Sequence, residues 1–509
     1  MREVGYKTQD RMKYLREAGY VVTEKWECEF RKEMKGNAEL KSLYRKCMHI
    51  NHLNPRDALY GGRTCSIKLY KRVEEGQKMV YVDFNSLYPD VNFRCEYPVG
   101  HPTVYNKGEI PNRVNGLLKC KVLPPRRLFL PILPYRCRGK LLFPLCRTCA
   151  ETCTQTQCPH ADEEERALTG TWVTLEIDKA LSLGYVVLEK YEAWDFEEFT
   201  KYDPASGDGG LLSGYIKTFV ALKQEASGYP DGVVTDEDKD RYVADYEAAE
   251  GIKLDKTKIE RNNALRTLCK QCSNCVWGKL SEGGGKTEWT YVTKPAEFIK
   301  MMTDDSIRIA DITYVSDNTV AVHWTRVEEF EEGLPTTNVV ISAYTTAHAR
   351  LKLYSEMERI GGRCYYHDTD SIIYRHDDSQ YNPTLSPYLG GLKDETDGVA
   401  ILEYVSGGPK NYAIRLSTGE SVCKIRGFTL SHRNAKLLNF DSMKRIVLGG
   451  FKESVTATNG CTFVRDGQGS VFTRETSKSY ALNFDKRLIA PDGVSTYPFG
   501  WTGEFDEIT

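Results

Sequence analysis

Hydrophobic and polar residues alternate in short runs along much of the chain, a pattern that is typical of strands. Residues 78–84 (KMVYVDF) form one such run, and Pro89 behind it predicts a turn. Residues 286–330 hold further runs around an Asp-Asn pair, so they predict β-hairpins. Residues 365–374 (YYHDTDSIIY) predict another hairpin, whose turn holds two aspartates between apolar arms.

Other segments repeat apolar residues at the spacing of a helix. Residues 211–280 predict two long helices joined by a polar connection rich in Asp, and another helix is expected from residue 343 to residue 360. Residues 1–55 predict a helix that stops at Gly19, an alternating strand (YVVTEKWECEF) and a second helix. A chain of 509 residues is too long for one core, so we expect about three or four subdomains.

The composition narrows the classes of protein that fit. Lys and Arg together number 69 and Asp and Glu 71, so no overall basic charge points to a nucleic-acid partner. No apolar run approaches a membrane span; we expect a soluble, intracellular protein without a membrane partner, in the nucleus or the host cytoplasm. Basic charge is local, since residues 111–150 hold nine Lys or Arg and no Asp or Glu. This segment is physically suited to phosphate contact.

The two aspartates of the predicted turn, Asp368 and Asp370, lie at the edge of an apolar core. Burying like charges together is unfavourable unless a bound cation or a raised pKa compensates. Mg²⁺ prefers hard oxygen ligands, and one short hairpin cannot complete its shell, so another carboxylate is needed. Asp83 also ends an apolar strand and is the candidate. The alternative is that Asp368 and Asp370 are ordinary turn residues and that Asp83 caps a strand.

Four residues recur at every fourth position within the segment LRTLCKQCSNCVWGKL: Arg266, Lys270, Asn274 and Gly278. This spacing places them on one face of a helix. Arg and Lys suit the oxygens of a triphosphate, and the missing side chain at Gly278 lets a base pair or a backbone approach closely. An isolated basic stripe is equally compatible with a helix face that points to solvent.

Metal-binding side chains gather in the stretch LCRTCAETCTQTQCPH: Cys146, Cys149, Cys153, Cys158 and His160. All of them except Cys153 form a Cys-x₂-Cys pair and a Cys-x-His pair, at spacings that suit a structural Zn²⁺. The alternative is a set of reduced cysteines without metal. The chain has 16 cysteines, most of them scattered, which fits a reducing compartment better than a disulfide framework.

Two of the acidic segments, taken together, resemble a known enzyme family. DFNSLYP at 83–89 and DTDS at 368–371 resemble motifs A and C of family B DNA polymerases. The helical segment between them resembles motif B of that family, Lys-x₃-Asn-Ser-x-Tyr-Gly. Here Cys275 replaces the serine and Trp277 replaces the tyrosine.

Further matches narrow the resemblance to the protein-primed members of the family. LYGGRT at 59–64 is similar to their linker motif, and PKNYA holds a Lys-x-Tyr motif at Lys410 and Tyr412. A basic insert between motifs A and B and a hairpin-rich insert between B and C stand where this group carries its two terminal-protein regions. The Cys-rich insert and LTGTWVT at 168–174 are most similar to polymerases of Maverick/Polinton elements and related viruses.

The resemblance implies a role for each matched residue. In the family, the aspartates of motifs A and C hold two metal ions that activate the primer 3′-hydroxyl and stabilise the pyrophosphate leaving group. Two Mg²⁺, or Mn²⁺ as a substitute, are therefore expected on Asp83, Asp368 and Asp370. Tyr88 would be the steric gate that excludes a 2′-hydroxyl. The nucleotide would also contact Ser86, Leu87, Arg266, Lys270 and Asn274. The DNA would contact Gly61, Gly62, Arg63, Gly278, Thr369, Lys410 and Tyr412.

The implied fold class is α+β, a right-hand polymerase with an antiparallel palm sheet, helical fingers, a thumb and two inserts that resemble terminal-protein regions. The expected subdomains are residues 1–55 (nuclease-like remnant), 56–100 (palm with motif A), 101–209 (first insert), 210–283 (fingers), 284–334 (second insert), 335–430 (palm with motif C) and 431–509 (thumb and C-terminal region). GYVVTEKWECEF in the first of these is similar to the end of a very-short-patch-repair-like nuclease. The Asp-x-Glu triplet at 245–247 falls in the fingers, so we expect no proofreading exonuclease in this chain.

The implied function is templated addition of dNTPs to a DNA 3′-end, in the replication of a mobile element or a viral genome. We expect a monomer whose partners are a DNA primer-template and dNTPs, with a terminal priming protein where synthesis starts from a protein hydroxyl. A catalytically inactive nucleic-acid-binding relic and a reverse transcriptase are the alternatives. The Asp-Thr-Asp turn argues against the second, because reverse transcriptases carry Tyr-x-Asp-Asp.

Overall fold

The computed structural model describes residues 52–283, 287–327, 336–465 and 470–505, and near the N-terminus residues 9, 12–17, 19–23, 25–37 and 39–40. The chain divides into two compact units, Met1–His52 and Leu53–Thr509. In the first unit, helix α2 spans Glu27–Gly36. The strand expected over YVVTEKWECEF does not form in its described residues, and residues 27–30 belong to α2 instead. Glu, Lys and Arg make up most of α2, and they favour a helix over the strand that the alternating pattern predicted.

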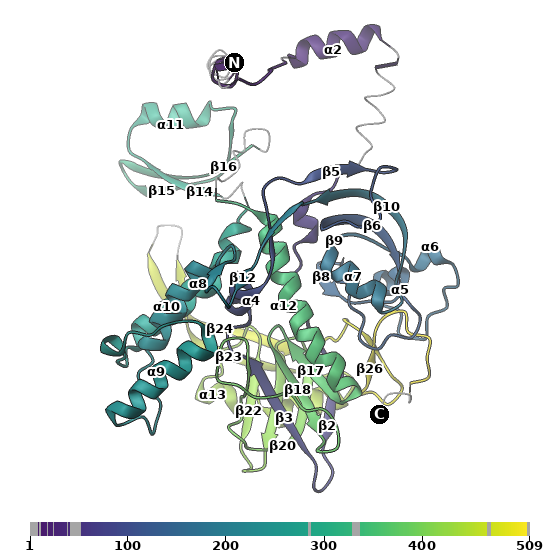
Figure 1. Ribbon diagram of the computed structural model, residues 1–509, viewed down its shortest axis with the longest axis vertical. Coiled ribbons are helices and arrows are strands. Elements are labelled where there is room, and N and C mark those ends of the chain that lie inside the picture. The colour runs from purple at the N-terminus through teal and green to yellow at the C-terminus, as the bar shows by residue number, and fades with distance from the viewer. Residues whose placement is uncertain are drawn as a thin grey trace. The chain divides into compact units, whose positions relative to one another are not determined.

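The second unit is built on a large antiparallel sheet of nine strands (Figure 1). Seven of them follow the order β1 (Thr64–Ser66), β17 (Cys364–Asp368), β18 (Ser371–His376), β3 (Lys78–Phe84), β20 (Ile401–Gly408), β21 (Asn411–Leu416) and β22 (Ser421–Ile425). The other two are β19 (Leu392–Asp394), which pairs with β3, and β2 (Tyr70–Arg72), which pairs with β20. Two distant parts of the chain thus share one sheet, as the palm prediction requires.

A long helix, α12 (Val339–Ile360), lies against the large sheet (Figure 1). It begins before the predicted start at residue 343, because the side chain of Asn338 accepts the backbone N–H of Ile341 and caps the helix there. The C-terminal half of α12 shares a hydrophobic core with β3 and β18. A short 3₁₀ turn, η4 (Gly361–Arg363), then leads into β17.

Strand β3 leads into helix α4 (Leu87–Arg94), so the turn predicted at Pro89 is wrong. Pro89 lies in the first turn of the helix, where a backbone N–H would have no partner within the helix, so proline costs no hydrogen bond there. Its fixed φ also suits a helix. The bend between strand and helix occurs at Ser86, whose φ of 56° lies in the left-handed region. A strand that leads directly into a helix thus replaces the predicted turn.

A second antiparallel sheet of four strands belongs to the first insert. Its order is β5 (Thr103–Asn106), β10 (Val186–Asp195), β6 (Gly116–Leu123) and β9 (Leu168–Val173). Helix α7 (Thr174–Ser182) follows β9, and the N-terminal half of α12 packs here, since Tyr344 and Ala347 share a core with Val173. Shorter elements nearby are η1 (Pro55–Ala58), β4 (Tyr97–Val99), β7 (Tyr135–Cys137), β8 (Lys140–Leu142), α5 (Arg147–Thr152), α6 (Glu163–Arg166), β11 (Glu198–Thr200), β12 (Tyr202–Asp203) and β13 (Asp208–Gly209).

Three long helices replace the two that were expected over residues 211–280: α8 (Ser213–Glu225), α9 (Asp236–Glu250) and α10 (Asn263–Leu280). The Asp-rich connection is itself helix α9, and the short 3₁₀ turn η2 (Lys256–Lys258) lies between α9 and α10. Thr235 and Asp238 form a reciprocal capping box at the start of α9. The acidic residues of the first turn also meet the positive end of the helix dipole. The residues that suggested a loop therefore stabilise a helix.

The second insert forms a sheet of three strands beside α11 (Pro295–Met302), in the order β14 (Glu288–Val292), β16 (Thr319–Arg326) and β15 (Ile307–Ser316). The hairpin turn predicted at the Asp-Asn pair is confirmed, because Ser316 pairs with Thr319 around it. After the large sheet come α13 (His432–Ala435), α14 (Phe440–Leu448), the hairpin β23 (Ser454–Arg465) and β24 (Val471–Ala481), β25 (Leu488–Ile489) and β26 (Thr496–Tyr497).

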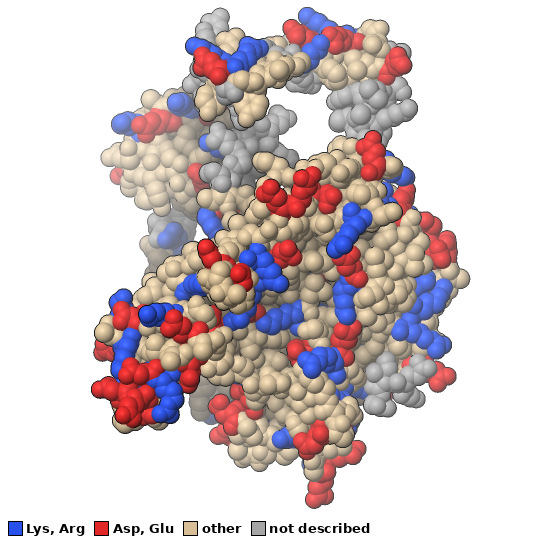
Figure 2. All heavy atoms as spheres, viewed as in Figure 1, with Lys and Arg blue, Asp and Glu red and all other residues tan. Residues whose placement is uncertain are grey.

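Charged side chains of both signs are mixed over the face shown in Figure 2, in keeping with a formal net charge of −2. Acidic groups gather at the lower left, where Figure 1 places α9. Within the part of the chain that the structure describes, the helices are too short or too polar to cross a bilayer.

Two arginines hold the linker that precedes β1. Arg350 of α12 donates to the carbonyl oxygens of Tyr60 and Gly61 at 2.7 and 3.0 Å. Arg136 of β7 donates to the carbonyl oxygen of Asp57 at 3.1 Å. Both guanidinium groups therefore bind the linker through its backbone carbonyl oxygens.

Arg350 also forms a bidentate ion pair with Glu176 of α7, with N···O distances of 2.8 and 2.9 Å. Both side chains are almost fully buried, at 2% and 0% exposure. Removing one partner of such a pair leaves an uncompensated charge in the interior. The pair therefore couples α12 to the first insert.

Glu176→Ala should lower the free energy of unfolding by about 3–5 kcal/mol, because the Arg350 guanidinium would stay buried without its anion. Urea denaturation followed by tryptophan fluorescence measures the change. The matched control is Glu453→Ala, which removes an exposed partner of Arg445 and should cost less than about 1 kcal/mol. Equal losses in the two variants would contradict the importance of the buried pair.

Candidate active site

The strand register brings the three predicted carboxylates together. Asp83 in β3 stands opposite Ser371 of β18, the residue directly after Asp370. The N–H of Phe84 donates to the carbonyl oxygen of Asp370 at 2.7 Å, which holds the two segments side by side. Asp368 is the last residue of β17, on the other side of the same turn. Residues that lie almost three hundred positions apart in sequence thus meet at the ends of neighbouring strands in the large sheet.

The turn between β17 and β18 is tight. Thr369 has a φ of 60°, in the left-handed region, and its N–H donates to the carbonyl oxygen of Arg63 at 2.8 Å. Gly62 lies directly against it, since a Cβ at that position would come 2.8 Å from Cγ2 of Thr369. A side chain at Gly62 would therefore push the turn out of place. Gly61 has open space on its Cβ side.

Two residues that were expected to contact DNA are buried. Arg63 is 2% exposed, donates to the carbonyl oxygen of Pro131 and lies 4.1 Å over the ring of Phe143. Tyr412 is 5% exposed, and its hydroxyl donates to the hydroxyl of Tyr81 at 3.0 Å. The prediction that these side chains contact DNA does not fit their placement, because each is enclosed by packing partners.

Burial raises the pKa of two of the three carboxylates. It raises the pKa of Asp83 to about 7, with repulsion by Asp370 adding to the shift and attraction by Lys270 opposing it. It raises the pKa of Asp370 to about 6, and repulsion by Asp368 adds to that shift. Burial and mutual repulsion therefore both disfavour the charged carboxylates, and a bound cation would offset both effects.

Asp368 has three polar partners. Its carboxylate lies 3.2 Å from Nζ of Lys410 and accepts hydrogen bonds from the hydroxyls of Tyr366 and Thr369, at 3.3 and 3.1 Å. The Lys410 side chain is 55% exposed, so it borders both the carboxylate and the solvent. The predicted Lys-x-Tyr motif thus contributes its lysine to the site and its tyrosine to the core.

Cations from two helices gather beside the loop that follows Asp83. Arg266 and Lys270 come from α10, as predicted, and Lys223 comes from the last turn of α8. Nζ of Lys223 donates to Oγ of Ser86 at 3.2 Å. Burial, followed by repulsion from Arg266 and Lys270, lowers the pKa of Lys223. The sequence gives no motif for Lys223; only the packing of α8 against α10 reveals it.

Tyr88 of α4 stacks on Trp277 of α10, with ring centroids 4.9 Å apart and an angle of 17° between the rings. Leu87 is 1% exposed and its side chain belongs to the main core. Asn274 donates to a backbone carbonyl one turn earlier in α10, at 2.7 Å. Gly278 has open space around it, as a close approach would require.

The predicted zinc ligands form a second site, in the first insert. The ligand atoms of Cys146, Cys149, Cys158 and His160 all lie within 4.8 Å of one another. Cys153, which the spacing left over, is outside this group.

Residues 40–231 match the model of a family described as DNA polymerase type B, organellar and viral. The matched region includes Asp83 and Tyr88 and ends shortly after α8. No protein with a curated description matches the sequence significantly.

Solved structures of phi29 DNA polymerase resemble the chain in fold. The complex with primer-template DNA and incoming nucleotide substrates has a TM-score of 0.50 and 14% identity, over 87% of this chain and 66% of that one. The complex with single-stranded DNA has a TM-score of 0.50 and 15% identity, over 90% of this chain and 67% of that one. The chain has an α+β polymerase fold and spans about two thirds of the phi29 polymerase.

Without divalent metal, the free energy of unfolding should fall as the pH rises from 5 to 8. Asp83 and Asp370 bind protons more tightly in the folded chain, so their contribution is complete below their ordinary pKa of 3.8 and is lost as the pH passes about 6 and 7. Urea denaturation in EDTA across this range measures the slope. Asp83→Asn should flatten it and exposed Asp378→Asn should not; the same slope in both variants would contradict the assignment.

Proposed function

We propose that the chain is a family B DNA-directed DNA polymerase that adds dNTPs to a DNA 3′-end. The observation that carries this proposal is the meeting of Asp83, Asp368 and Asp370 beside the cations of α8 and α10. The family match of residues 40–231 and the phi29-like fold support it. The phi29 structures hold primer-template DNA and incoming nucleotides, and we propose the same two partners for this chain.

The three carboxylates suit hard divalent cations. Their donor atoms are all oxygen, and a cation would offset the burial and the mutual repulsion that raise the pKa of Asp83 and Asp370. Two Mg²⁺, with Mn²⁺ as a substitute, would activate the primer 3′-hydroxyl and stabilise the pyrophosphate leaving group. Asp83 in β3 and Asp370 in the turn before β18 would hold the cations, and Lys410 and the hydroxyl of Tyr366 keep the Asp368 carboxylate in place.

The lysine and arginine side chains of the fingers helices α8 and α10 bind the triphosphate. Arg266 and Lys270 present charged N–H groups to phosphate oxygens, and Lys223 adds a third charge from the facing helix. Tyr88 lies under the sugar and excludes a 2′-hydroxyl. Its stacking on Trp277 holds the ring in one orientation. An aromatic residue at position 277 thus serves the gate although it is not the tyrosine of motif B.

Synthesis also starts from a protein hydroxyl in this proposal, and the chain replicates a Maverick/Polinton-like element or a related viral genome. The support is the linker motif at 59–64, the two inserts and the segment LTGTWVT, which forms β9 and the start of α7. Comparing incorporation from a protein hydroxyl with incorporation from a DNA primer tests this part by itself.

Asp370→Ala should lower primer extension with dNTPs and Mg²⁺ by roughly 10³-fold or more, because losing one metal-binding carboxylate removes several kcal/mol of transition-state stabilisation. Gel analysis of an extended primer measures the rate. Asp378→Ala, which removes a 99% exposed side chain just beyond β18, is the matched control and should keep the wild-type rate. If wild type and Asp370→Ala bind primer-template but both fail to extend it, the chain is an inactive relic.

Tyr88→Val should raise the ratio of rNTP to dNTP incorporation by roughly 10–100-fold, because the smaller side chain leaves room for a 2′-hydroxyl. Single-nucleotide incorporation with matched rNTP and dNTP pairs measures the ratio. Tyr191→Val changes the same residue type in β10 of the first insert and should leave it unchanged. Unaltered sugar selectivity in Tyr88→Val would remove the gate assignment.

A further inference from the structure

The cysteine cluster of the first insert has the dimensions of an occupied zinc site. The Sγ atoms of Cys146, Cys149 and Cys158 lie 3.5, 3.3 and 3.6 Å from Nδ1 of His160. In a tetrahedral site with Zn–S bonds of about 2.3 Å and a Zn–N bond of about 2.0 Å, a sulfur and a nitrogen are separated by about 3.5 Å. All three distances therefore match one metal ion at the centre of the group.

Hydrogen bonding among reduced thiols does not account for this arrangement. A neutral imidazole nitrogen that accepts has one lone pair in the ring plane, so Nδ1 of His160 can accept from one thiol. Three sulfur atoms surround it at nearly equal distance. The cysteines are free thiols in the structure, so no disulfide explains the approach. A cation that all four atoms share explains it directly.

The local fold builds the first half of the site. Cys146 caps α5, and its Sγ accepts the backbone N–H of Cys149 at 3.5 Å. An N–H group aimed at a sulfur stabilises the thiolate form that a metal requires. Cys153 ends the same helix with a φ of 54°, and its sulfur receives the guanidinium of Arg138 instead. Cys153, the thiol of this stretch that is not among the proposed ligands, therefore has a different partner.

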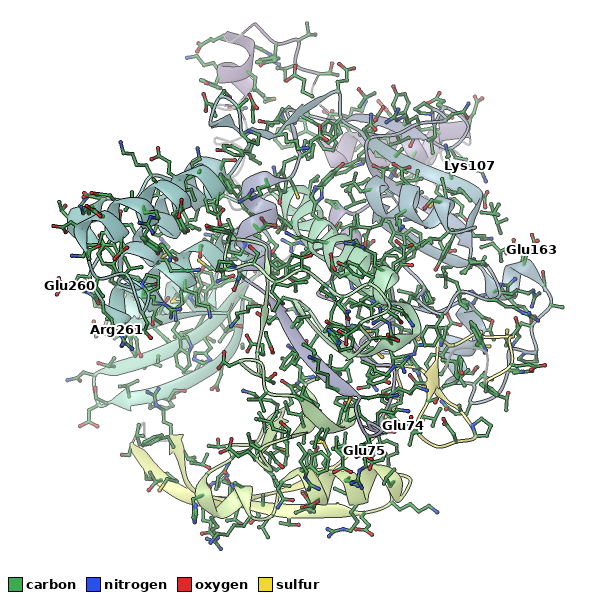
Figure 3. The ribbon with its side chains drawn as sticks, turned by 60° about the horizontal axis from the view of Figure 1, so that its bottom comes forward. Glu74, Glu75, Lys107, Glu163, Glu260 and Arg261 are labelled. Carbon is green, nitrogen blue, oxygen red and sulfur yellow. The ribbon has the colours of Figure 1, made fainter. Side chains whose placement is uncertain are left out.

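The ligands are bonded through their backbone to the C-terminal segment (residues 485–505). The N–H of Leu145 donates to the carbonyl oxygen of Phe499 at 2.7 Å, and the N–H of Cys158 donates to that of Trp501 at 2.9 Å. Gly500 between them has a φ of 95°, and a Cβ there would lie 2.5 Å from the backbone N of Cys146. In Figures 1 and 3 this yellow segment runs beside α5 and α6, the latter marked by Glu163 in Figure 3.

The same segment is bonded to the large sheet on its other side. The N–H of Leu69 donates to the carbonyl oxygen of Val494 at 2.7 Å, and the N–H of Thr496 donates to that of Ile67 at 2.9 Å. Ile67 and Leu69 lie in the connection between β1 and β2, just after β1, whose Thr64 pairs with Asp368. The C-terminal segment thus lies between the cysteine cluster and the strand next to the carboxylates.

We propose that Cys146, Cys149, Cys158 and His160 bind one structural Zn²⁺ and that this ion fixes the C-terminal segment between the first insert and the large sheet. Four protein ligands complete a tetrahedral shell and leave no open position for water or substrate, so the ion performs no chemistry. Because each ligand pair is joined to the segment by a backbone hydrogen bond, losing the ion releases the segment from the insert.

Zinc analysis of the purified full chain by inductively coupled plasma mass spectrometry tests the ligand set. Wild type should hold about one Zn²⁺ per chain, and Cys158→Ser and His160→Ala should hold less than about a tenth of that. His160→Cys should retain the ion, because a fourth thiolate completes the shell. Cys153→Ser is the matched control and should also retain it. Zinc-free wild type, or zinc in Cys158→Ser equal to that in Cys153→Ser, would overturn the site.

Hydrogen exchange on wild-type protein tests the fixing of the C-terminal segment without relying on a variant that folds. Removing zinc with a chelator should speed exchange of the amides of Leu145 and Cys158, which donate to this segment, by about tenfold or more and leave those of α9 unchanged. Cobalt added afterwards should restore slow exchange and give the absorption of a tetrahedral cobalt thiolate. Unchanged exchange after loss of the ion would refute the proposal that zinc fixes the C-terminal segment. Neither readout depends on polymerase activity, so the proposed function can fail while the zinc site stands.

Discussion

Three like charges held at the ends of neighbouring strands are the constraint on which this active-site region depends. Packing holds them there although burial, and then their mutual repulsion, raises the pKa of Asp83 and Asp370. The packing comes from the core that the large sheet shares with α12, which includes Val82 and Ile372 beside the carboxylates. Lys270 on α10 and Lys410 in the turn between β20 and β21 offset part of the charge. A cation or a nucleotide phosphate with its metal would complete what the fold leaves electrostatically open.

Local patterns in the sequence predicted the acidic strand ends and the cationic helix face, and the resemblance to family B polymerases implied the α+β class. The register that sets Asp83 opposite Ser371 could not be predicted, because contacts between distant segments decide it. Burial is equally non-local. Arg63 and Tyr412 have side chains that suit DNA but are enclosed by the core, whereas Lys223 belongs to no motif and reaches the site because α8 packs on α10. The helix α9 was missed because Asp favours both loops and helix starts.

The cysteine cluster shows the same division between local and distant information. Ligand spacing in the stretch from Cys146 to His160 indicated four donors and excluded Cys153, and the structure brings those four together. The spacing gave no sign that Phe499 and Trp501 would form the backbone partners of this stretch. A glycine with positive φ between them permits the close approach. The insert and the end of the chain therefore form one packing unit with the edge of the large sheet.

The contacts of Arg350 with residues 60 and 61 have a consequence for behaviour in salt. Arg350 is buried and binds carbonyl dipoles and Glu176, so mobile ions cannot enter to weaken these contacts. Contacts between basic residues and a phosphate backbone are exposed and weaken steeply as ionic strength rises. The linker that supports the Thr369 turn should therefore keep its path in concentrations of salt that strip a nucleic acid from the surface. Under the proposed function, release of DNA and loss of the architecture around the carboxylates would be separate events.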